Sequence, residues 1–406
     1  MQPMQNNNYD VIIIGAGIVG LATALQLLQK NNTLNVLILE KENAIAKHQT
    51  GNNSGVIHSG IYYKPNSLRA SNCLRGYKML VDFCEAENIP FDICGKIIVA
   101  TKEDELRRLQ NIYHRGIENG LKGLEMLDET AIKQHEPHCA GIKGIFVPQT
   151  GIIDYTEVAR KYAEKIKTLN GNILVNQKVT DIQNKNNEIK ITTISATYTA
   201  KQLINCAGLY SDKIAKLSNT AISVRIVPFR GEYYVLKKEK EYLVKDLIYP
   251  VPDPDFPFLG VHFTRFIHGG VEAGPNAVLA YAREGYKKSD IVWSEFFESI
   301  FYRGFISLAL KNWRTGLGEM QRSYSKKAFT AALQRLIPEI GSDDLIPGEA
   351  GVRASAMDRN GNVVDDFIIE QHENCIHVLN SPSPAATASL SIGLTIAEMS
   401  LKELKL

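Results

Sequence analysis

The segment "GNNSGVIHSGIYY", Gly51 to Tyr63, combines a titratable ring with residues that favour flexible backbone. His58 stands among glycine, serine and asparagine and is followed by Tyr62 and Tyr63. An imidazole can donate or accept a proton near neutral pH, so this segment could take part in proton transfer. Its purpose depends on what the preceding fifty residues bind.

Those residues contain the pattern G-x-G-x-x-G at Gly15, Gly17 and Gly20, and Glu40 lies twenty positions after Gly20. Gly15 allows a tight turn, Gly17 lets the backbone approach a pyrophosphate, and Gly20 allows helix and strand to pack closely. A helix N-terminus then offers N–H donors to phosphate. Glu40 can accept hydrogen bonds from ribose hydroxyls and would repel a 2′-phosphate, so NADP is disfavoured. The motif alone does not decide between NAD and FAD, and a glycine turn without a ligand is the competing interpretation.

A second small-residue segment, "NSPSPAATASLSIG" from Asn380 to Gly393, reads as a strand end, a loop and then a helix. The N-terminus of that helix could stabilise negative charge on a flavin ring. An ordinary loop before a helix explains the same residues equally well.

Regular elements must position these groups. Val11–Ile14 predicts a buried parallel strand, Leu21–Lys30 a helix and Asn35–Glu40 a second strand, which together form a β-α-β unit. Residues 84–145 are charged and mostly helical in pattern, and residues 220–350 alternate tyrosine-rich strands with proline-rich loops. We predict a discontinuous nucleotide domain and a second domain formed by two insertions. The nucleotide domain takes residues 1–84, 146–218 and 346–406; the second takes residues 85–145 and 219–345.

The composition is that of an ordinary globular chain of 406 residues, with 44% hydrophobic and 22% charged residues. The net charge of +2 gives no basis for a nucleic-acid partner. The six cysteines form no C-x-x-C pair, so we predict reduced thiols and no metal site. The N-terminus has no targeting pattern and no apolar run reaches ~18 residues, the length of a spanning helix. We therefore expect a cytoplasmic protein, with a peripheral position on the inner face of the cell membrane as the alternative.

Motifs along nearly the whole chain resemble one family. They are "YDVIIIGAGIVG", "HQTGNNSGVIHSGIYY", "GIIDYTEVAR", "INCAGLYSD", "PFRGEYY", "GVHFTR", "AGVRA" and "NSPSPAATASLSIG". The chain is similar to the FAD-dependent D-amino-acid-oxidase-like oxidoreductases, and within these to the L-2-hydroxyglutarate oxidase or dehydrogenase branch. The first motif is shared by many flavoproteins, whereas the His-Ser-Gly-Ile-Tyr-Tyr and Ser-Pro-Ser-Pro-Ala-Ala segments are much more specific.

This resemblance implies an α/β fold. A Rossmann-like FAD-binding domain of the glutathione-reductase-like type would carry an inserted α+β substrate domain built on an antiparallel sheet. It implies noncovalent FAD and oxidation of L-2-hydroxyglutarate to 2-oxoglutarate, by hydride transfer from C2 to flavin N5. Quinone or O2 would accept the electrons. Two alternatives are an amine or amino-acid oxidase on the same scaffold and a nucleotide-binding protein without turnover.

The resemblance also assigns catalytic roles. His58 would lie at the edge of the substrate cavity and act as the general base that removes the hydroxyl proton. His262 is the rival base, and a structural hydrogen bond is the other interpretation of His58.

Substrate carboxylates require cationic donors. Arg353 would bind the α-carboxylate through its planar fork, and Arg265 the distal carboxylate, unless Arg265 is a salt-bridged strand residue. Tyrosine hydroxyls at positions 62, 63, 233 and 234 could donate further hydrogen bonds to the carboxylates, or the rings could simply pack. Of these, we assign Tyr62, Tyr63 and Tyr233 to substrate binding.

The residues expected to bind the cofactor come from four parts of the chain. They are Gly15, Gly17, Gly20, Glu40, Lys41, Thr50, Asn53, Ser54, Gly55, Val179, Ala207, Gly208, Pro384, Ala385, Ala386 and Thr387.

Residues 291–310 carry an apolar stripe at helical spacing, which includes Trp293, Phe297 and Phe301. The pattern predicts one helix. We interpret the stripe as packing beneath the substrate-domain sheet, because basic residues are sparse; an interfacial helix that meets a membrane is the alternative.

Overall fold

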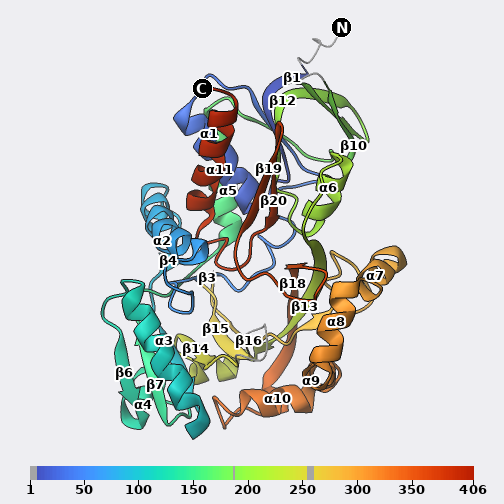
Figure 1. Ribbon diagram of the computed structural model, residues 1–406. Helices are drawn as coiled ribbons and strands as arrows, with labels where there is room; N and C mark the ends of the chain where they lie inside the picture. Colours follow the sequence, from blue (N-terminus) through green and yellow to red (C-terminus); the bar gives the residue numbers. More distant parts are fainter. Residues whose placement is uncertain (1–6, 186–187, 254–259) are drawn as a thin grey trace.

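The computed structural model describes residues 7–185, 188–253 and 260–406 and contains two large β-sheets, each with its own helices and hydrophobic core (Figure 1). The first and last described residues, Asn7 and Leu406, both lie in the unit that holds the first sheet. This arrangement is the expected α/β fold with a second, sheet-based domain.

The first sheet follows the order β10-β11-β12-β1-β2-β9, with β20 beside β12 and β19 beside β20. Neighbours from β9 through β2, β1 and β12 to β20 are parallel, whereas β10–β11–β12 and β19–β20 are antiparallel. The strands are β1 (Asn8–Ile14), β2 (Val36–Leu39), β9 (Asn172–Leu174), β10 (Val179–Lys185), β11 (Glu188–Thr193), β12 (Thr197–Asn205), β19 (Ile368–His372) and β20 (Cys375–Asn380). Val36–Leu39 is buried throughout, as a strand covered on both faces requires.

Helices cover both faces of this sheet. On one side lie α1 (Ile18–Lys30), α2 (Leu68–Ala86), α5 (Tyr155–Thr168) and α11 (Ser389–Glu403), and on the other lies α6 (Ser211–Leu217) (Figure 1). Gly393 allows α11 to approach α1, because a Cβ there would lie 2.7 Å from the Ala22 backbone carbon.

The second sheet follows the order β17-β13-β16-β15-β14-β5-β7-β6, with β18 on the other side of β13. It is antiparallel except for the β14–β5 pair. The strands are β5 (Lys96–Ala100), β6 (Glu125–Asp128), β7 (Lys143–Val147), β13 (Arg225–Leu236), β14 (Leu247–Pro250), β15 (His262–Arg265), β16 (Val271–Gly274), β17 (Val278–Leu279) and β18 (Leu345–Met357). Three short strands form a further sheet, β3 (Val56–Ile57), β8 (Gly151–Ile153) and β4 (Phe91–Asp92).

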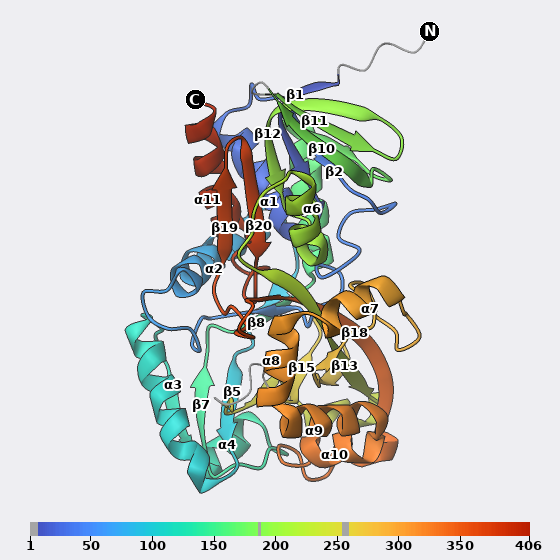
Figure 2. The same ribbon diagram turned by 45° about the vertical axis from the view of Figure 1, so that its right-hand side comes forward.

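Helices flank the second sheet, and α7 to α10 follow one another along its outer side (Figure 2). They are α3 (Leu106–Glu118), α4 (Glu129–His135), α7 (Trp293–Ile300), α8 (Arg303–Lys311), α9 (Trp313–Tyr324) and α10 (Lys326–Leu333). Single 3-10 turns occur at η1 (Glu103–Glu105), η2 (Gly208–Tyr210), η3 (Lys238–Leu243) and η4 (Ser342–Asp344). Within the described ranges, no helix has the length and apolar character needed to cross a bilayer.

Three expectations need correction. Residues 84–145 include β5, β6 and β7 as well as helices, because their strands are short and flanked by charged helical turns. The single helix expected over residues 291–310 is divided into α7 and α8, with Phe301 at the C-terminal end of α7. Trp293, Phe297 and Phe301 are exposed, so this part of the stripe does not pack beneath the sheet. Phe305 and Leu308 of the same stripe do pack against buried residues of β13 and β18.

The division into domains stays a prediction, but one strand bears on it. Residues Leu345–Met357 form β18, which pairs with β13 from Leu345 opposite Leu236 to Met357 opposite Arg225. Every paired residue of β18 thus lies beside β13, which the predicted boundary at residue 346 assigns to the other domain.

Candidate functional site

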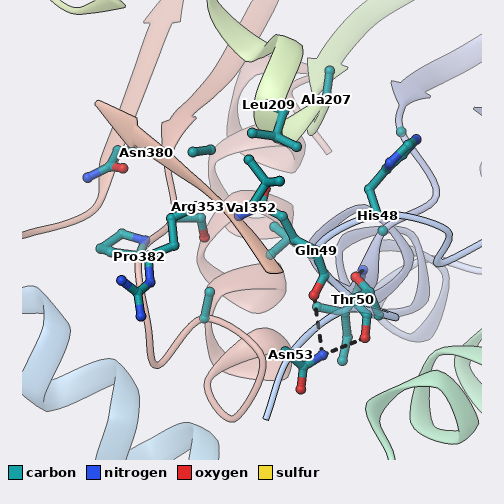
Figure 3. Close-up of a pocket in the computed structure, with 18 of the residues that line it drawn as sticks. His48, Gln49, Thr50, Asn53, Ala207, Leu209, Val352, Arg353, Asn380 and Pro382 are labelled. Carbon is teal, nitrogen blue, oxygen red and sulfur yellow. Dashed lines mark hydrogen bonds between the residues drawn. The ribbon is translucent and has the colours of Figure 1, made fainter. Parts of the chain in front are cut away.

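A cavity of about 1100 Å³ lies between the two units and runs from the β1–α1 turn to the second sheet. Its wall includes Glu40 at one end and Arg353 at the other. Figure 3 shows how β18 carries Val352 and Arg353 toward the loop that holds Gln49, Thr50 and Asn53. The volume exceeds that of a typical small-ligand pocket, so it can hold a large cofactor together with a small substrate.

The β1–α1 turn has the backbone geometry expected of a phosphate-binding turn. Gly15 has φ +103°, and a Cβ there would lie 2.5 Å from the Cys206 carbonyl oxygen. A Cβ on Gly20 would lie 2.1 Å from the Gly15 carbonyl oxygen. Gly17 caps α1, and a Cβ on it would lie no closer than 3.5 Å to its nearest neighbour, Thr50 Oγ1, so the helix N-terminus opens onto the cavity.

Glu40 lies at the carboxyl end of β2 and is almost fully buried. Its two carboxylate oxygens accept hydrogen bonds from the backbone amides of Ala16 (2.8 Å) and Glu42 (2.9 Å). Each oxygen keeps further acceptor capacity toward the cavity. A ribose diol therefore fits this position, whereas a phosphate would be repelled.

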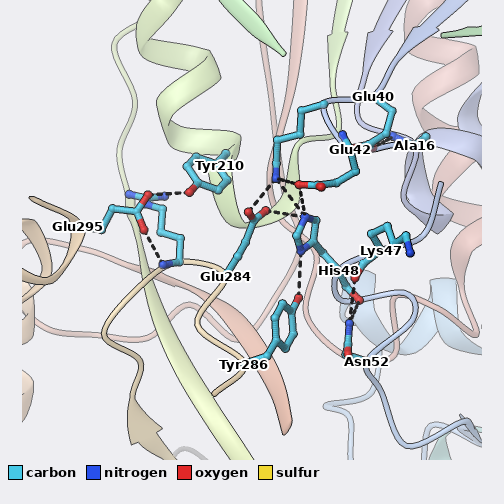
Figure 4. Close-up of polar contacts among 12 residues, drawn as sticks. Ala16, Glu40, Glu42, Lys47, His48, Asn52, Tyr210, Glu284, Tyr286 and Glu295 are labelled. Atoms are coloured by element: carbon cyan, nitrogen blue, oxygen red, sulfur yellow. Dashed lines mark hydrogen bonds and ion pairs between the residues drawn. The ribbon is translucent and has the colours of Figure 1, made fainter. Parts of the chain in front are cut away.

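Lys41 joins the two units in a polar network with Glu42, His48 and Glu284 (Figure 4). Its Nζ lies 2.5 Å from Glu42, 3.0 Å from His48 and 2.7 Å from Glu284. Burial opposes the charge on Lys41, but the hydrogen bonds to Glu284 and Glu42 outweigh it and raise its pKa. Glu42, His48 and Glu284 are close enough to hold a metal ion, yet the lysine ammonium already supplies their cation.

The glycine segment is joined to the loop after β20. The His58 amide donates to Thr387 Oγ1 (3.1 Å), and His58 Nε2 forms a hydrogen bond with Ser383 Oγ (3.1 Å). Thr387 also bonds the Tyr155 hydroxyl at 2.7 Å. Gly60 at φ +91° provides the turn that follows the histidine. Two segments more than 300 residues apart thus form one wall of the cavity.

Both predicted histidines line the cavity in neutral form. Burial and the charges of Lys96 and Arg69 lower the pKa of His58 to about 3. Burial lowers the pKa of His262 to about 3 as well, and the charges of Arg353 and Lys96 act in the same direction. Each ring is therefore unprotonated at neutral pH, and the low pKa also makes it a weak base.

The His262 ring has a defined orientation. It stacks on Tyr249 with ring centroids 4.0 Å apart. Its Nδ1 lies 2.9 Å from the Gly260 carbonyl oxygen, which can only accept a hydrogen bond. Nδ1 therefore carries the proton, and Nε2 is the basic nitrogen.

Arg353 and three of the predicted tyrosines also line the cavity. The Tyr233 hydroxyl is hydrogen-bonded to Arg353. Tyr63 lies under the Arg69 guanidinium, 4.4 Å from ring centroid to Cζ, and the buried Tyr62 hydroxyl has no hydrogen-bond partner in the described part of the chain.

Several predicted residues lie elsewhere. Arg265 is outside the main cavity and pairs with Asp92 (2.6 Å) and Asp246 (3.4 Å), which matches the salt-bridged alternative rather than a role in carboxylate binding. Asn53 does line the cavity, but its side chain is engaged by backbone groups of its own loop, and its Nδ2 donates to Thr50 O at 2.6 Å. Four further predicted residues do not line the main cavity. Gly55 lines a smaller neighbouring cavity, whereas Gly20, Thr387 and Tyr234 lie behind the wall.

The remaining cofactor candidates line the cavity as expected: Gly15, Gly17, Glu40, Lys41, Thr50, Asn53, Ser54, Val179, Ala207, Gly208, Pro384, Ala385 and Ala386. Sequence reasoning missed Arg69, Tyr249 and Ser383, which also belong to the wall, and Lys96 behind it. Arg69 lies in a helix without any distinguishing motif. The fold brings Asp365 and the Ser383 carbonyl into contact with Arg69, and these contacts cannot be read from the sequence.

Known proteins with similar sequences support this assembly. Residues 10–399 match the sequence model of the family described as "FAD dependent oxidoreductase". The chain is 58% identical to L-2-hydroxyglutarate dehydrogenase of Indibacter alkaliphilus, over 97% of this chain and 99% of that protein. It is 44% identical to the human mitochondrial L-2-hydroxyglutarate dehydrogenase, over 97% of this chain and 88% of the relative.

Solved structures agree on the fold. L-α-glycerophosphate oxidase from Mycoplasma pneumoniae, solved with FAD bound, superposes with a TM-score of 0.78 at 23% identity, covering 98% of this chain and 95% of that one. Glycine oxidase from Geobacillus kaustophilus superposes with a TM-score of 0.72 at 15% identity, covering 98% of this chain and 95% of that one.

We expect Gly15→Ala to abolish dinucleotide retention and to lower thermal stability strongly. The new Cβ would meet the Cys206 carbonyl oxygen at 2.5 Å in a backbone conformation that already disfavours alanine. Gly120→Ala is the control, because Gly120 has φ +79° and no atom within 4 Å of its Cβ direction. The control should lose only about 1 kcal/mol of unfolding free energy. Equal losses in the two variants, measured by thermal denaturation and bound-cofactor absorbance, would contradict this assignment.

Proposed function

The chain belongs to the family of FAD-dependent oxidoreductases, and we propose that it oxidises L-2-hydroxyglutarate to 2-oxoglutarate. Full-length relatives from bacteria and animals that carry the name L-2-hydroxyglutarate dehydrogenase support this substrate. The observation that carries the proposal is a single cavity that joins a dinucleotide-binding edge to Arg353 and two neutral histidines.

The wall residues fit FAD. The open N-terminus of α1 suits the pyrophosphate and Glu40 suits the adenosine ribose. The small side chains of Pro384, Ala385 and Ala386 leave room for a flat ring beside the glycine segment. When bound there, FAD supplies the two-electron acceptor for the hydride of substrate C2.

The protein's own groups would orient the substrate and move its hydroxyl proton. Arg353 can bind the α-carboxylate through two parallel hydrogen bonds, with Tyr233 holding the guanidinium. A neutral histidine, His58 or His262, then accepts the proton of the C2 hydroxyl as C2 becomes a carbonyl carbon. Because the histidine takes this proton as the hydride leaves, charge does not build up on the substrate oxygen.

Anaerobic addition of L-2-hydroxyglutarate to the purified yellow protein should bleach the long-wavelength flavin band. D-2-hydroxyglutarate and L-glutamate are the controls and should leave it unchanged, because the first places the hydride on the wrong face and the second offers an ammonium group. Bleaching by amino acids instead would support the amine-oxidase alternative. A coloured protein that no hydroxy acid bleaches would contradict the proposed reaction.

We expect His58→Ala to keep its FAD and to lose about 100-fold or more in turnover, the usual effect of removing a general base. His262→Ala tests the rival base in the same assay. His114→Ala, on the exposed face of α3, is the control and should match the wild type. Near-normal turnover of His58→Ala together with loss in His262→Ala would transfer the role to His262.

For the electron acceptor we propose membrane quinone, with O2 as the alternative, and a peripheral position at the bilayer. Of nineteen exposed large apolar side chains among the described residues, eleven lie in residues 291–324. Both tryptophans of the chain, Trp293 and Trp313, are among them, 61% and 57% exposed. Trp293, Phe297 and Phe301 stack in a row along α7. Exposed aromatic rings on helices are typical of proteins that rest on the lipid interface.

Charge on the same helices suits an anionic surface. Arg303, Lys311 and Arg314 are exposed, whereas the acids of α7 are engaged: Glu295 by Tyr210 and Glu298 by Lys213. The apolar row is therefore accompanied by cations that anionic lipid would attract.

A variant with Trp293, Phe301 and Leu310 each changed to serine should bind vesicles of phosphatidylcholine and phosphatidylglycerol at least about tenfold more weakly than the wild type, since each side chain loses its burial in lipid. Its turnover with a soluble dye acceptor should be unchanged. Serine at the exposed Ile117, Ile142 and Ile194 is the matched control. Sedimentation with vesicles measures the binding of the wild type and of both variants. A wild type that does not sediment would refute the membrane position.

A further inference from the structure

Lys96, the first residue of β5, is a buried lysine with no anionic partner among the described residues. It is 2% exposed, and its Nζ lies 4.6 Å from the ring centroid of Tyr62 and 4.8 Å from that of Tyr249. Both tyrosines line the main cavity. Within the part of the chain that the structure describes, no group accepts a hydrogen bond from Nζ and no carboxylate forms an ion pair with it.

An ammonium in this position is costly unless an anion accompanies it. The two ring faces offset part of that cost. Burial lowers the pKa of Lys96 to about 7, and the only neighbour that acts against this shift is the Cys73 thiol. Burial raises the pKa of Cys73 to about 12, so the thiol is itself neutral at physiological pH. The residues that the structure describes therefore supply no counter-charge, and a bound anion would stabilise the site.

The position of Lys96 relative to the reaction centre follows from the sheet. The strand order β18-β13-β16-β15-β14-β5 places the His262 strand between the strands of Arg353 and Lys96. The charges of both Arg353 and Lys96 lower the pKa of His262, so both lie within electrostatic range of that ring. The charge of Lys96 also lowers the pKa of His58. The two histidines thus lie in a cavity that Arg353 lines directly and that Lys96 approaches behind the rings of Tyr62 and Tyr249.

We infer that Lys96, together with the unpartnered Tyr62 hydroxyl, binds the second carboxylate of a dicarboxylic substrate and so selects 2-hydroxy dicarboxylic acids over monocarboxylic ones. The inference rests on the proposed function, and it assigns to Lys96 the role that the sequence had suggested for Arg265. Lys96 is a binding residue here and takes no part in proton or hydride transfer.

The test compares L-2-hydroxyglutarate with L-2-hydroxyvalerate, which has the same carbon chain but a methyl group in place of the distal carboxylate. The wild type should show a kcat/KM at least about 100-fold lower for the monocarboxylate, because a buried charge would be left unpaired. Lys96→Met should lower kcat/KM for the dicarboxylate by about 100-fold, mainly through KM, and change that for the monocarboxylate less than about threefold. Lys143→Met is the matched control, since Lys143 is exposed on β7 of the same sheet.

Binding of glutarate and pentanoate, followed through the perturbation of the flavin spectrum, gives a readout independent of turnover. Glutarate should bind the wild type at least about tenfold more tightly than Lys96→Met, and pentanoate should bind both equally. A wild type that treats the two hydroxy acids alike, or a variant that keeps the wild-type preference, overturns the inference and leaves the proposed function intact. A wild type that oxidises neither acid overturns the proposed function, and glutarate binding then decides the inference. The wild-type comparisons need no variant, so they decide it even where Lys96→Met fails to fold.

Discussion

The parallel pairing of β12 with β1 on one side and β20 on the other is the constraint on which the site depends. Ile14 lies opposite Asn205, and Asn205 lies opposite His377, so β1 and β12 end together at one edge of the sheet and β20 runs on in the same direction to Asn380. Buried Asn205 fixes that edge: its Oδ1 accepts from the Ala207 amide, and its Nδ2 contacts Ser211 O and His377 Nδ1. The glycine turn, the Ala207–Gly208 turn and the loop after Asn380 therefore emerge side by side, where ligands of open α/β sheets bind.

The cavity also needs its two walls held together, and adjacent residues of one loop do this. Arg283 forms a buried pair with Asp212 at the start of α6, with Nη1–Oδ1 2.5 Å and Nη2–Oδ2 3.0 Å. Glu284 reaches Lys41 and His48 beside the nucleotide edge. A buried pair contributes little net stability because desolvation opposes it, but either partner alone would be strongly unfavourable. These contacts therefore specify how the second sheet lies over the first more than they strengthen either unit.

The nucleotide edge could be predicted from the sequence because its signals are local. The β-branched run before Gly15, the glycine spacing and the acid at position 40 lie within thirty residues. At the substrate end the family resemblance indicated His58, His262 and Arg353, which line the cavity. Lys96 and Tyr249 could not be found in the sequence, because β5 and β14 join the other strands through non-local pairing. Strand parity does exclude one prediction: His262 and Arg265 are three residues apart on β15, so their side chains leave opposite faces. The apolar stripe of residues 291–310 had a readable period, but periodicity does not say whether the stripe faces a sheet or the outside.

Electrostatics connects substrate binding with the strength of the base. Cations and burial keep His58 and His262 neutral, and the same factors make each a weak base while the cavity holds no anion. A carboxylate on Arg353 offsets one of the charges that depress the pKa of His262, and its own negative charge favours the imidazolium. On the proposed mechanism, the general base would therefore gain affinity for a proton as an acidic substrate enters. On the same proposal, a neutral alcohol would meet a less basic histidine, so the cavity would discriminate in the chemical step as well as in binding.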